Sequence, residues 1–149
     1  MKCFEAPNEL EVSEKSVFMA GGISGCLDWQ KELIKLLENE QILIINPRRR
    51  EFHFSKEIEK QQIAWEHKYL RKADAVSFWF PKETVCPITL FELGTVLMLG
   101  KTIFIGIDPE YSRKSNVEIQ SKLVHPEIKF FYSVKDLGEE IKKWNEHKN

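Results

Sequence analysis

Short apolar runs alternate with longer amphipathic stretches along most of the chain, and this alternation constrains the fold more than any other feature. A short run that is apolar throughout is typical of a strand buried on both faces of a parallel sheet. Parallel strands need a helix-length connection between them, and the amphipathic stretches supply it. The alternation predicts a single α/β domain with about five parallel strands and helices on both faces of the sheet.

The element boundaries follow from apolar spacing and from helix-end signals. Pro87 suits the first turn of a helix, and Gly100 is a typical residue after the last turn. Residues 1–15 are interpreted as an N-terminal tail, so the domain is expected over residues 16–149. The expected strands cover residues 16–20, 42–45, 75–80, 102–106 and 128–131. The expected helices cover residues 27–39, 56–72, 87–99, 116–123 and 134–144.

Charge and hydropathy exclude several classes of protein. The 149 residues include 22 Lys and Arg against 23 Asp and Glu, a net charge of −1, whereas binding along a nucleic acid needs clustered excess cations. The longest nearly uncharged apolar stretch, residues 86–100, is shorter than the roughly 20 residues of a membrane span. The first residues lack the basic start and apolar core of a secretion signal. We expect a cytoplasmic protein that binds neither nucleic acid polymers nor membranes.

Metal and cofactor motifs are not evident in the sequence. The 3 cysteines and 4 histidines lack the spacing of a zinc site, and an odd number of cysteines fits a reducing cytosol. Residues 21–25 match neither the dinucleotide fingerprint nor the Walker A spacing. We therefore expect no metal and no cofactor.

Glu92 is the only charged residue in the segment 86–99, which contains the expected helix 87–99 and the residue before it. This helix is apolar around nearly its whole circumference. Such a helix is buried, and a buried carboxylate is costly unless it is paired or hydrogen-bonded. A cost of this kind is typical of a functional residue. The alternative is that Glu92 reaches the helix edge or bonds a backbone group.

Glu66 lies in the middle of the apolar arc of the expected helix 56–72. Its carboxylate should point towards the pocket side, unless it extends to solvent or pairs with Arg48 or Arg49. Two inward carboxylates on different helices suit chemistry at a sugar carbon. One can attack or stabilise an oxocarbenium-like centre while the other handles hydroxyl groups or a proton.

Further candidates lie where the expected strands end, because ligands bind there in sheets of this kind. The first of these strand ends is followed by the glycine-rich loop 21–25. Its glycines let the backbone approach a ligand, and the following helix offers free N–H groups. A plain tight turn explains this loop equally well. The residues of this loop are Gly21, Gly22, Ile23, Ser24 and Gly25.

The next two strand ends carry basic and aromatic residues. Asn46 and Pro47 precede Arg48, Arg49 and Arg50, which can hold a phosphate or form a solvated loop. Trp79 ends the third expected strand, at the expected mouth of the pocket, where a flat base can stack. Core packing explains the neighbouring phenylalanines at least as well.

Six motifs in this order together resemble the nucleoside 2-deoxyribosyltransferase superfamily, and within it most closely the deoxyribosyltransferase-like branch. The resemblance covers roughly residues 16–120 and is more specific than any single motif. The motifs are AGGISG at 20–25, INPRR at 45–49, QIAWEHKYLRKAD at 62–74, FWFP at 78–81, PITLFELG at 87–94 and GKTIFIG at 100–106.

The resemblance implies a flavodoxin-like three-layer fold and a double displacement at C1′ of a nucleoside. Glu92 would be the nucleophile that forms a glycosyl-enzyme, and Glu66 matches a position where relatives use Asp to hold the sugar and assist the leaving base. Residues 21–23 would line the sugar, and Trp79 would flank the base. Because the family builds its sites at subunit interfaces, a homodimer or larger homo-oligomer with shared active sites is implied.

Two residues depart from the family pattern. Phe18 stands where relatives carry a Tyr that hydrogen-bonds the nucleophile. Cys86 stands where the transferases have Asp and the nucleotide hydrolases have Ser. The leading hypothesis is a nucleoside 2-deoxyribosyltransferase. The alternatives are a 2′-deoxynucleoside 5′-monophosphate N-glycosidase, in which Arg48 and Arg49 hold the phosphate, and a non-catalytic nucleotide sensor.

Overall fold

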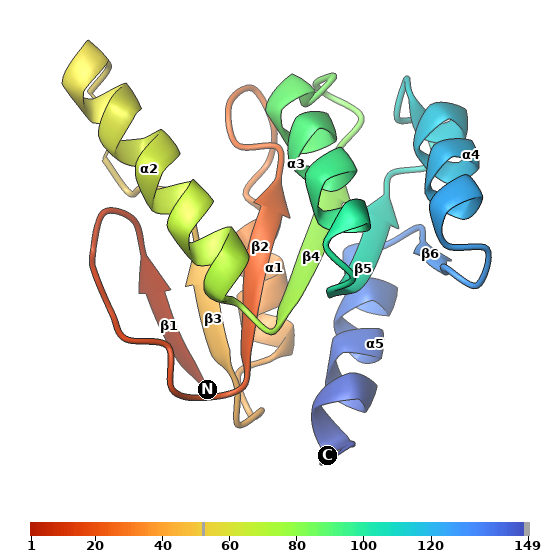
Figure 1. Ribbon diagram of the computed structural model, residues 1–149, viewed down its shortest axis with the longest axis horizontal. Coiled ribbons are helices and arrows are strands. Elements are labelled where there is room, and N and C mark those ends of the chain that lie inside the picture. Colours follow the sequence, from red (N-terminus) through yellow and green to blue (C-terminus); the bar gives the residue numbers. More distant parts are fainter. Residues whose placement is uncertain (52, 148–149) are drawn as a thin grey trace.

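The computed structural model describes residues 1–51 and 53–147, and in them a single sheet of six strands runs parallel throughout. The strand order is β1-β3-β2-β4-β5-β6 (Figure 1). The strands are β1 (Lys2–Glu5), β2 (Ser16–Gly21), β3 (Leu43–Asn46), β4 (Ala75–Phe80), β5 (Thr102–Ile107) and β6 (Phe130–Phe131).

Helices cover both faces of the sheet, which gives the flavodoxin-like three-layer arrangement that the sequence predicts. Helices α2, α3 and α4 lie on one face, and α1 and α5 lie on the other (Figure 1). Each face has its own apolar core, with Trp65 of α2 in one and Leu137 of α5 in the other. The helices are α1 (Trp29–Leu36), α2 (Lys56–Lys72), α3 (Pro87–Met98), α4 (Lys114–Val124) and α5 (Val134–Glu146).

Local signals explain most of the helix boundaries. Ser55 Oγ accepts a hydrogen bond from the N–H of Ile58 at the start of α2, and Ser133 caps α5 in the same way. α2 and β4 have the bounds that the sequence predicts. α1 is shorter than the predicted 27–39, because its helical backbone begins only after the capping residue Asp28.

The segment 1–15 is not a separate tail, because it contributes β1 to the sheet. β1 pairs with β3 from Lys2 opposite Leu43 to Glu5 opposite Asn46. The residues that follow are held on α2, since Trp65 Nε1 donates to Asn8 O at 2.7 Å and the Tyr69 hydroxyl accepts from the N–H of Leu10 at 2.9 Å. The sheet therefore has six strands, one more than the expected number.

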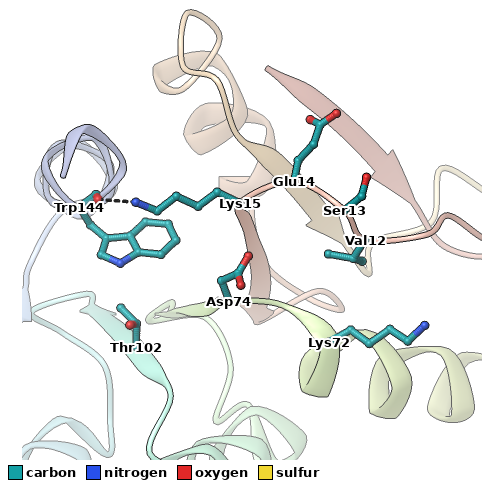
Figure 2. Close-up of a pocket in the computed structure, with 8 residues that line it drawn as sticks. All are labelled: Val12, Ser13, Glu14, Lys15, Lys72, Asp74, Thr102 and Trp144. Carbon is teal, nitrogen blue, oxygen red and sulfur yellow. Dashed lines mark hydrogen bonds between the residues drawn. The ribbon is translucent and has the colours of Figure 1, made fainter. Parts of the chain in front are cut away.

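The amino-terminal end of the sheet carries a cavity of about 710 Å³ between the segment before β2 and the end of α5. Figure 2 shows its lining residues: Val12, Ser13, Glu14, Lys15, Lys72, Asp74, Thr102 and Trp144. Lys15 Nζ donates to Trp144 O at 2.8 Å and lies 4.1 Å from the centre of the indole ring. Asp74 accepts from the N–H and the hydroxyl of Ser16. These contacts connect β2 to the end of α5 and to the loop before β4.

Candidate active site

A second cavity, of about 250 Å³, lies at the opposite end of the sheet, beside the carboxyl end of β2. It is formed by the end of β2 and the loop after it, by the start of α3 and the loop before it, and by one side chain of α2. Its lining residues are Gly21, Gly22, Ile23, Ser24, Glu66, Thr84, Cys86, Pro87, Ile88, Thr89 and Glu92. The structure thus brings together seven of the site residues that the sequence analysis selects, the two carboxyl groups among them.

Glu92 lies on α3 with its carboxyl group turned into this cavity. Its Oε2 atom is buried and has no hydrogen-bond partner within residues 1–51 and 53–147. Burial raises the pKa of Glu92 to about 8, and the negative charge of Glu66 contributes to the rise. Near neutral pH the carboxyl group of Glu92 therefore keeps its proton in the ligand-free protein.

Glu66 is half-buried on α2 and faces the same cavity. Its Oε1 atom accepts a hydrogen bond from Gln62 Nε2 at 2.7 Å. Burial raises the pKa of Glu66, while the bond from Gln62 and the charge of Arg49 act in the opposite direction. The two carboxyl groups thus differ in their surroundings, since Glu66 has a donor and a nearby cation.

A third cavity, of about 230 Å³, continues from the carboxyl pair into the groove between α2 and α3. It shares Glu66, Ile88 and Glu92 with the second cavity. Its walls are mainly apolar. They are formed by Ile63, Glu66, His67, Leu70, Arg71, Ile88, Phe91, Glu92 and Thr95. The carboxyl pair therefore lies between a loop-lined cavity and an apolar, helix-lined one.

The comparison with known families agrees with this geometry. Residues 14–111 match the family model described as "Nucleoside 2-deoxyribosyltransferase like". The chain belongs to this family. The match includes Glu66 and Glu92 and every other residue of the second cavity, and it extends from the start of β2 to just beyond β5. A search of curated proteins gives no match.

In this deoxyribosyltransferase-like chain, close packing within the protein accounts for the two glycines at the end of β2, Gly21 and Gly22. A Cβ atom on Gly21 would come within 2.5 Å of Trp29 Cζ2, and one on Gly22 within 2.6 Å of Pro81 Cγ. Trp29 Nε1 and Gln30 Nε2 both donate to Gly22 O, at 2.8 and 3.2 Å. The loop at the cavity is therefore fixed from behind by the side chains of α1.

Trp79 does not line the cavity, contrary to the expectation from the sequence. It is buried on the other face of the sheet, in the core formed with Trp29 and Leu137. Its neighbours Phe78 and Phe80 point to the face that α2 and α3 cover. Because side chains alternate along a strand, the aromatic run FWF places only its flanking residues on the face of the site.

Asn46 and Arg48 also lie outside the lining of the cavity, because their side chains bond to other parts of the protein. Asn46 Oδ1 accepts from the N–H of Arg48 at 3.0 Å, which closes the turn after β3. Arg48 Nη1 donates to Gln30 Oε1 at 3.0 Å and lies 3.7 Å from Asp28 Oδ1. In this structure Asn46 orders the loop after β3, and Arg48 fastens that loop to Gln30 of α1.

Cys86 lines the cavity from the residue that precedes α3. Its backbone is left-handed, with φ of 52°, and its Sγ atom lies 3.6 Å from Thr84 O. Burial raises the pKa of its thiol to about 11, so the group stays neutral at physiological pH. Where the transferase pattern has a charged Asp, this family member presents a small, uncharged side chain.

Four cavity residues escape the sequence analysis: Thr84, Pro87, Ile88 and Thr89. Their only signal is their position: Thr84 lies in the loop before α3, and the other three form the first turn of α3, within five residues of Glu92. Within the described parts of the chain, no cluster of three or more His, Cys, Asp or Glu side chains is arranged to hold a metal ion. None of the helices described there has the length and apolar character needed to cross a membrane.

Proposed function

We propose that the protein cleaves the N-glycosidic bond of small nucleosides and transfers the 2-deoxyribosyl group to another base. The observation that carries the proposal is the carboxyl pair. Glu92 and Glu66 lie at one cavity, on different helices, at the carboxyl end of a parallel sheet. Membership of the deoxyribosyltransferase-like family supports the same reaction.

Glu92 is the proposed nucleophile. Its carboxylate attacks C1′ of the nucleoside, an ester bond forms between Glu92 and the sugar, and the C1′–N bond breaks with its electron pair leaving on the base. Glu66 binds the sugar and gives a proton to the leaving base. A second base then attacks C1′, its proton passes to Glu66, and the Glu92 carboxylate is released.

The raised pKa of Glu92 determines which of the two carboxyl groups carries the proton before the reaction begins. A carboxyl group with a pKa of about 8 is protonated at neutral pH and is then a poor nucleophile. Attack on C1′ therefore requires the proton to leave Glu92, and the neighbouring Glu66 carboxylate is its acceptor. From Glu66 the proton goes to the departing base, so the pair supplies the acid that the reaction needs.

The proposed substrate is a nucleoside rather than a polymer. The two cavities that meet at the carboxyl pair have volumes of about 250 and 230 Å³, which suit a sugar and a base. Arg48 bonds to α1 and Arg49 to α2, and neither lines the two cavities that meet at the carboxyl pair. The alternative monophosphate N-glycosidase is favoured by one observation, namely that Arg71 lines the third cavity.

A second copy of the chain is the proposed partner, as in the homo-oligomers of related proteins. Ile63, Ile88 and Phe91 border the third cavity and are 60%, 64% and 75% exposed. A partner seated on these side chains would bury them and close the groove beside the carboxyl pair. Phe91→Glu should therefore give a smaller species in light scattering, whereas Phe54→Glu, at an equally exposed residue, should not. Equal masses for both variants would count against this interface.

The experiment for the catalytic proposal is base exchange followed by chromatography. The protein is incubated with a panel of ribo- and 2′-deoxynucleosides, their 5′-monophosphates and free adenine. We expect new 2′-deoxyadenosine from the deoxynucleosides and its loss in Glu92→Ala. Glu57→Ala, at an exposed position of α2, is the matched control and should keep full activity.

The same panel separates the alternatives. Release of base without exchange, and only from monophosphates, would replace the transferase with the hydrolase. Tight binding of a nucleotide without turnover would favour the non-catalytic sensor. Undiminished exchange in Glu92→Ala would remove Glu92 from the reaction.

A further inference from the structure

Gln62 connects the carboxyl pair to the loop after β3. It lies one helical turn before Glu66 on α2, so both side chains emerge on the same side of the helix. Its Nε2 atom donates to Glu66 Oε1 at 2.7 Å and to Pro47 O at 2.8 Å. Its Oε1 atom accepts from Arg49 Nε.

These contacts allow only one orientation of the Gln62 amide. A guanidinium group can only donate, and a backbone carbonyl can only accept. The amide oxygen must therefore face Arg49, and the amide nitrogen must face Pro47 O. Both amide hydrogens are then in use, one on Pro47 and one on Glu66, so Gln62 can donate to Glu66 but cannot accept from it.

We propose that Gln62 is a positioning residue, locked by Arg49 and Pro47, whose fixed amide donor keeps Glu66 as the ionised member of the carboxyl pair. The inference rests on the proposed function and deepens it, since it assigns the shared proton of the resting site to Glu92. A donor that cannot turn into an acceptor stabilises a carboxylate more than a carboxylic acid, because the hydrogen bond to the charged oxygen is the stronger one.

The charged groups around the pair are consistent with this assignment. Glu66 faces Arg49 from the loop after β3 and Glu92 from α3, while His67 and Arg71 of its own helix line the adjoining cavity. Glu92 meets the charge of Glu66, and its Oε2 atom is without a donor among the residues that the structure describes. The hydrogen-bond donor, Gln62, and the cation whose charge acts on the pair, Arg49, both lie on the Glu66 side.

The assignment has a consequence for the reaction. The bond from Gln62 lowers the affinity of Glu66 for a proton, so protonated Glu66 is a stronger acid towards the leaving base. During the first displacement the proton moves from Glu92 to Glu66 and then to the base nitrogen as the C1′–N bond breaks. Gln62 thus acts on the reaction through Glu66 and does not touch the sugar itself.

The test is a titration of the side-chain carboxyl groups by ¹³C NMR in the ligand-free, full-length protein. Glu66→Gln and Glu92→Gln identify the two signals. In Gln62→Met, which keeps the length of the side chain without its amide, we expect the pKa of Glu66 to rise by about one unit. The pKa of Glu92 should change much less, because Glu66 is still ionised at the pH where Glu92 titrates.

Gln61→Met is the matched control. Gln61 is the preceding residue and also accepts from Arg49, at 3.1 Å, but it makes no contact with Glu66 among the hydrogen bonds of the described chain. Both carboxyl titrations should be unchanged in it. Gln62→Asn withdraws the amide from Glu66 by one methylene group and should shift the titrations as Gln62→Met does. It replaces Gln62→Met in the experiment if the Met variant does not fold.

A rise in the pKa of Glu66 is a signature that general loosening of α2 would not produce, because loosening exposes both carboxyl groups to water and lowers both pKa values. An unchanged or lowered pKa of Glu66 in both Gln62 variants would overturn the proposal. The titration needs no substrate, so it can succeed even if base exchange fails. Base exchange without the rise in the pKa of Glu66 would leave the proposed function in place and remove the role of Gln62.

Discussion

The two ends of the sheet each carry a cavity lined by two acidic side chains, and the surroundings of these carboxyl groups differ. At the amino-terminal end, Asp74 accepts two hydrogen bonds from Ser16, and Lys15 bonds to the end of α5. At the carboxyl end, Glu92 has a buried oxygen that bonds to nothing in residues 1–51 or 53–147. The amino-terminal cavity is the larger, at about 710 against 250 Å³.

The comparison shows that cavity size does not identify the site in this molecule. A carboxylate that accepts hydrogen bonds from its own donors stabilises the fold. Such a carboxylate is not placed to exchange a proton with a ligand. A buried carboxyl group beside a second carboxyl group destabilises the fold when it is ionised. Such a pair is typical of a catalytic site, where protons are transferred and covalent bonds form and break. The comparison predicts that substitutions at the two ends affect different properties.

The largest expected difference is in turnover. Glu66→Gln should slow base exchange by about 10²- to 10⁴-fold, the usual contribution of a general acid–base group. Asp74→Asn makes the same chemical change at the other end and should leave the exchange rate unaltered. Rates are compared under identical conditions by chromatography. A loss of exchange in Asp74→Asn as large as in Glu66→Gln would break the distinction between the two ends.

The second difference is in the pH dependence of stability. The pKa of Glu92 is about 8 in the folded protein against an ordinary value of 4.5, so the unfolded chain releases this proton first as pH rises. Between these pH values Glu92 should lower the free energy of unfolding by on the order of 4 kcal/mol. Glu92→Gln should remove most of this fall, as measured by urea denaturation at pH 5 and pH 8. Parallel losses in both proteins would contradict the burial of an unpaired carboxyl group.

The third and smallest effect concerns Asp74. Asp74→Ala removes the acceptor for the N–H and the hydroxyl of Ser16, and should lower the free energy of unfolding by about 2 kcal/mol. Thermal and urea denaturation measure the loss, while the rate of base exchange should stay unchanged. An unaltered stability would show that these two hydrogen bonds do not hold this end of the sheet.

The sequence predicts most of the fold because buried parallel strands and amphipathic helices leave strong patterns. β4 and α2 have their predicted bounds for this reason. β1 is missed because four residues with charged ends, KCFE, lack the apolar run of an interior strand. Its position is decided by pairing with β3 and by contacts of the following segment with α2, which are properties of the folded chain.

The site is predicted less evenly than the fold. Glu92 stands out as a single charge in an apolar helix, and Glu66 as a charge within an apolar arc. Trp79 is misplaced because β4 is buried on both faces, so burial alone does not say which face a side chain takes. Arg48 and Gln62 are long side chains whose partners lie on other elements or in a distant loop, and no spacing in the sequence indicates those partners.

The measurement that tests the central claim most directly is mass spectrometry of the acid-quenched protein after incubation with a 2′-deoxynucleoside. The account predicts a covalent 2-deoxyribosyl group on the peptide that contains Glu92, which disappears when an acceptor base is added. Base exchange with the sugar attached to another residue, such as Glu66, or with the same adduct in Glu92→Gln, would contradict it.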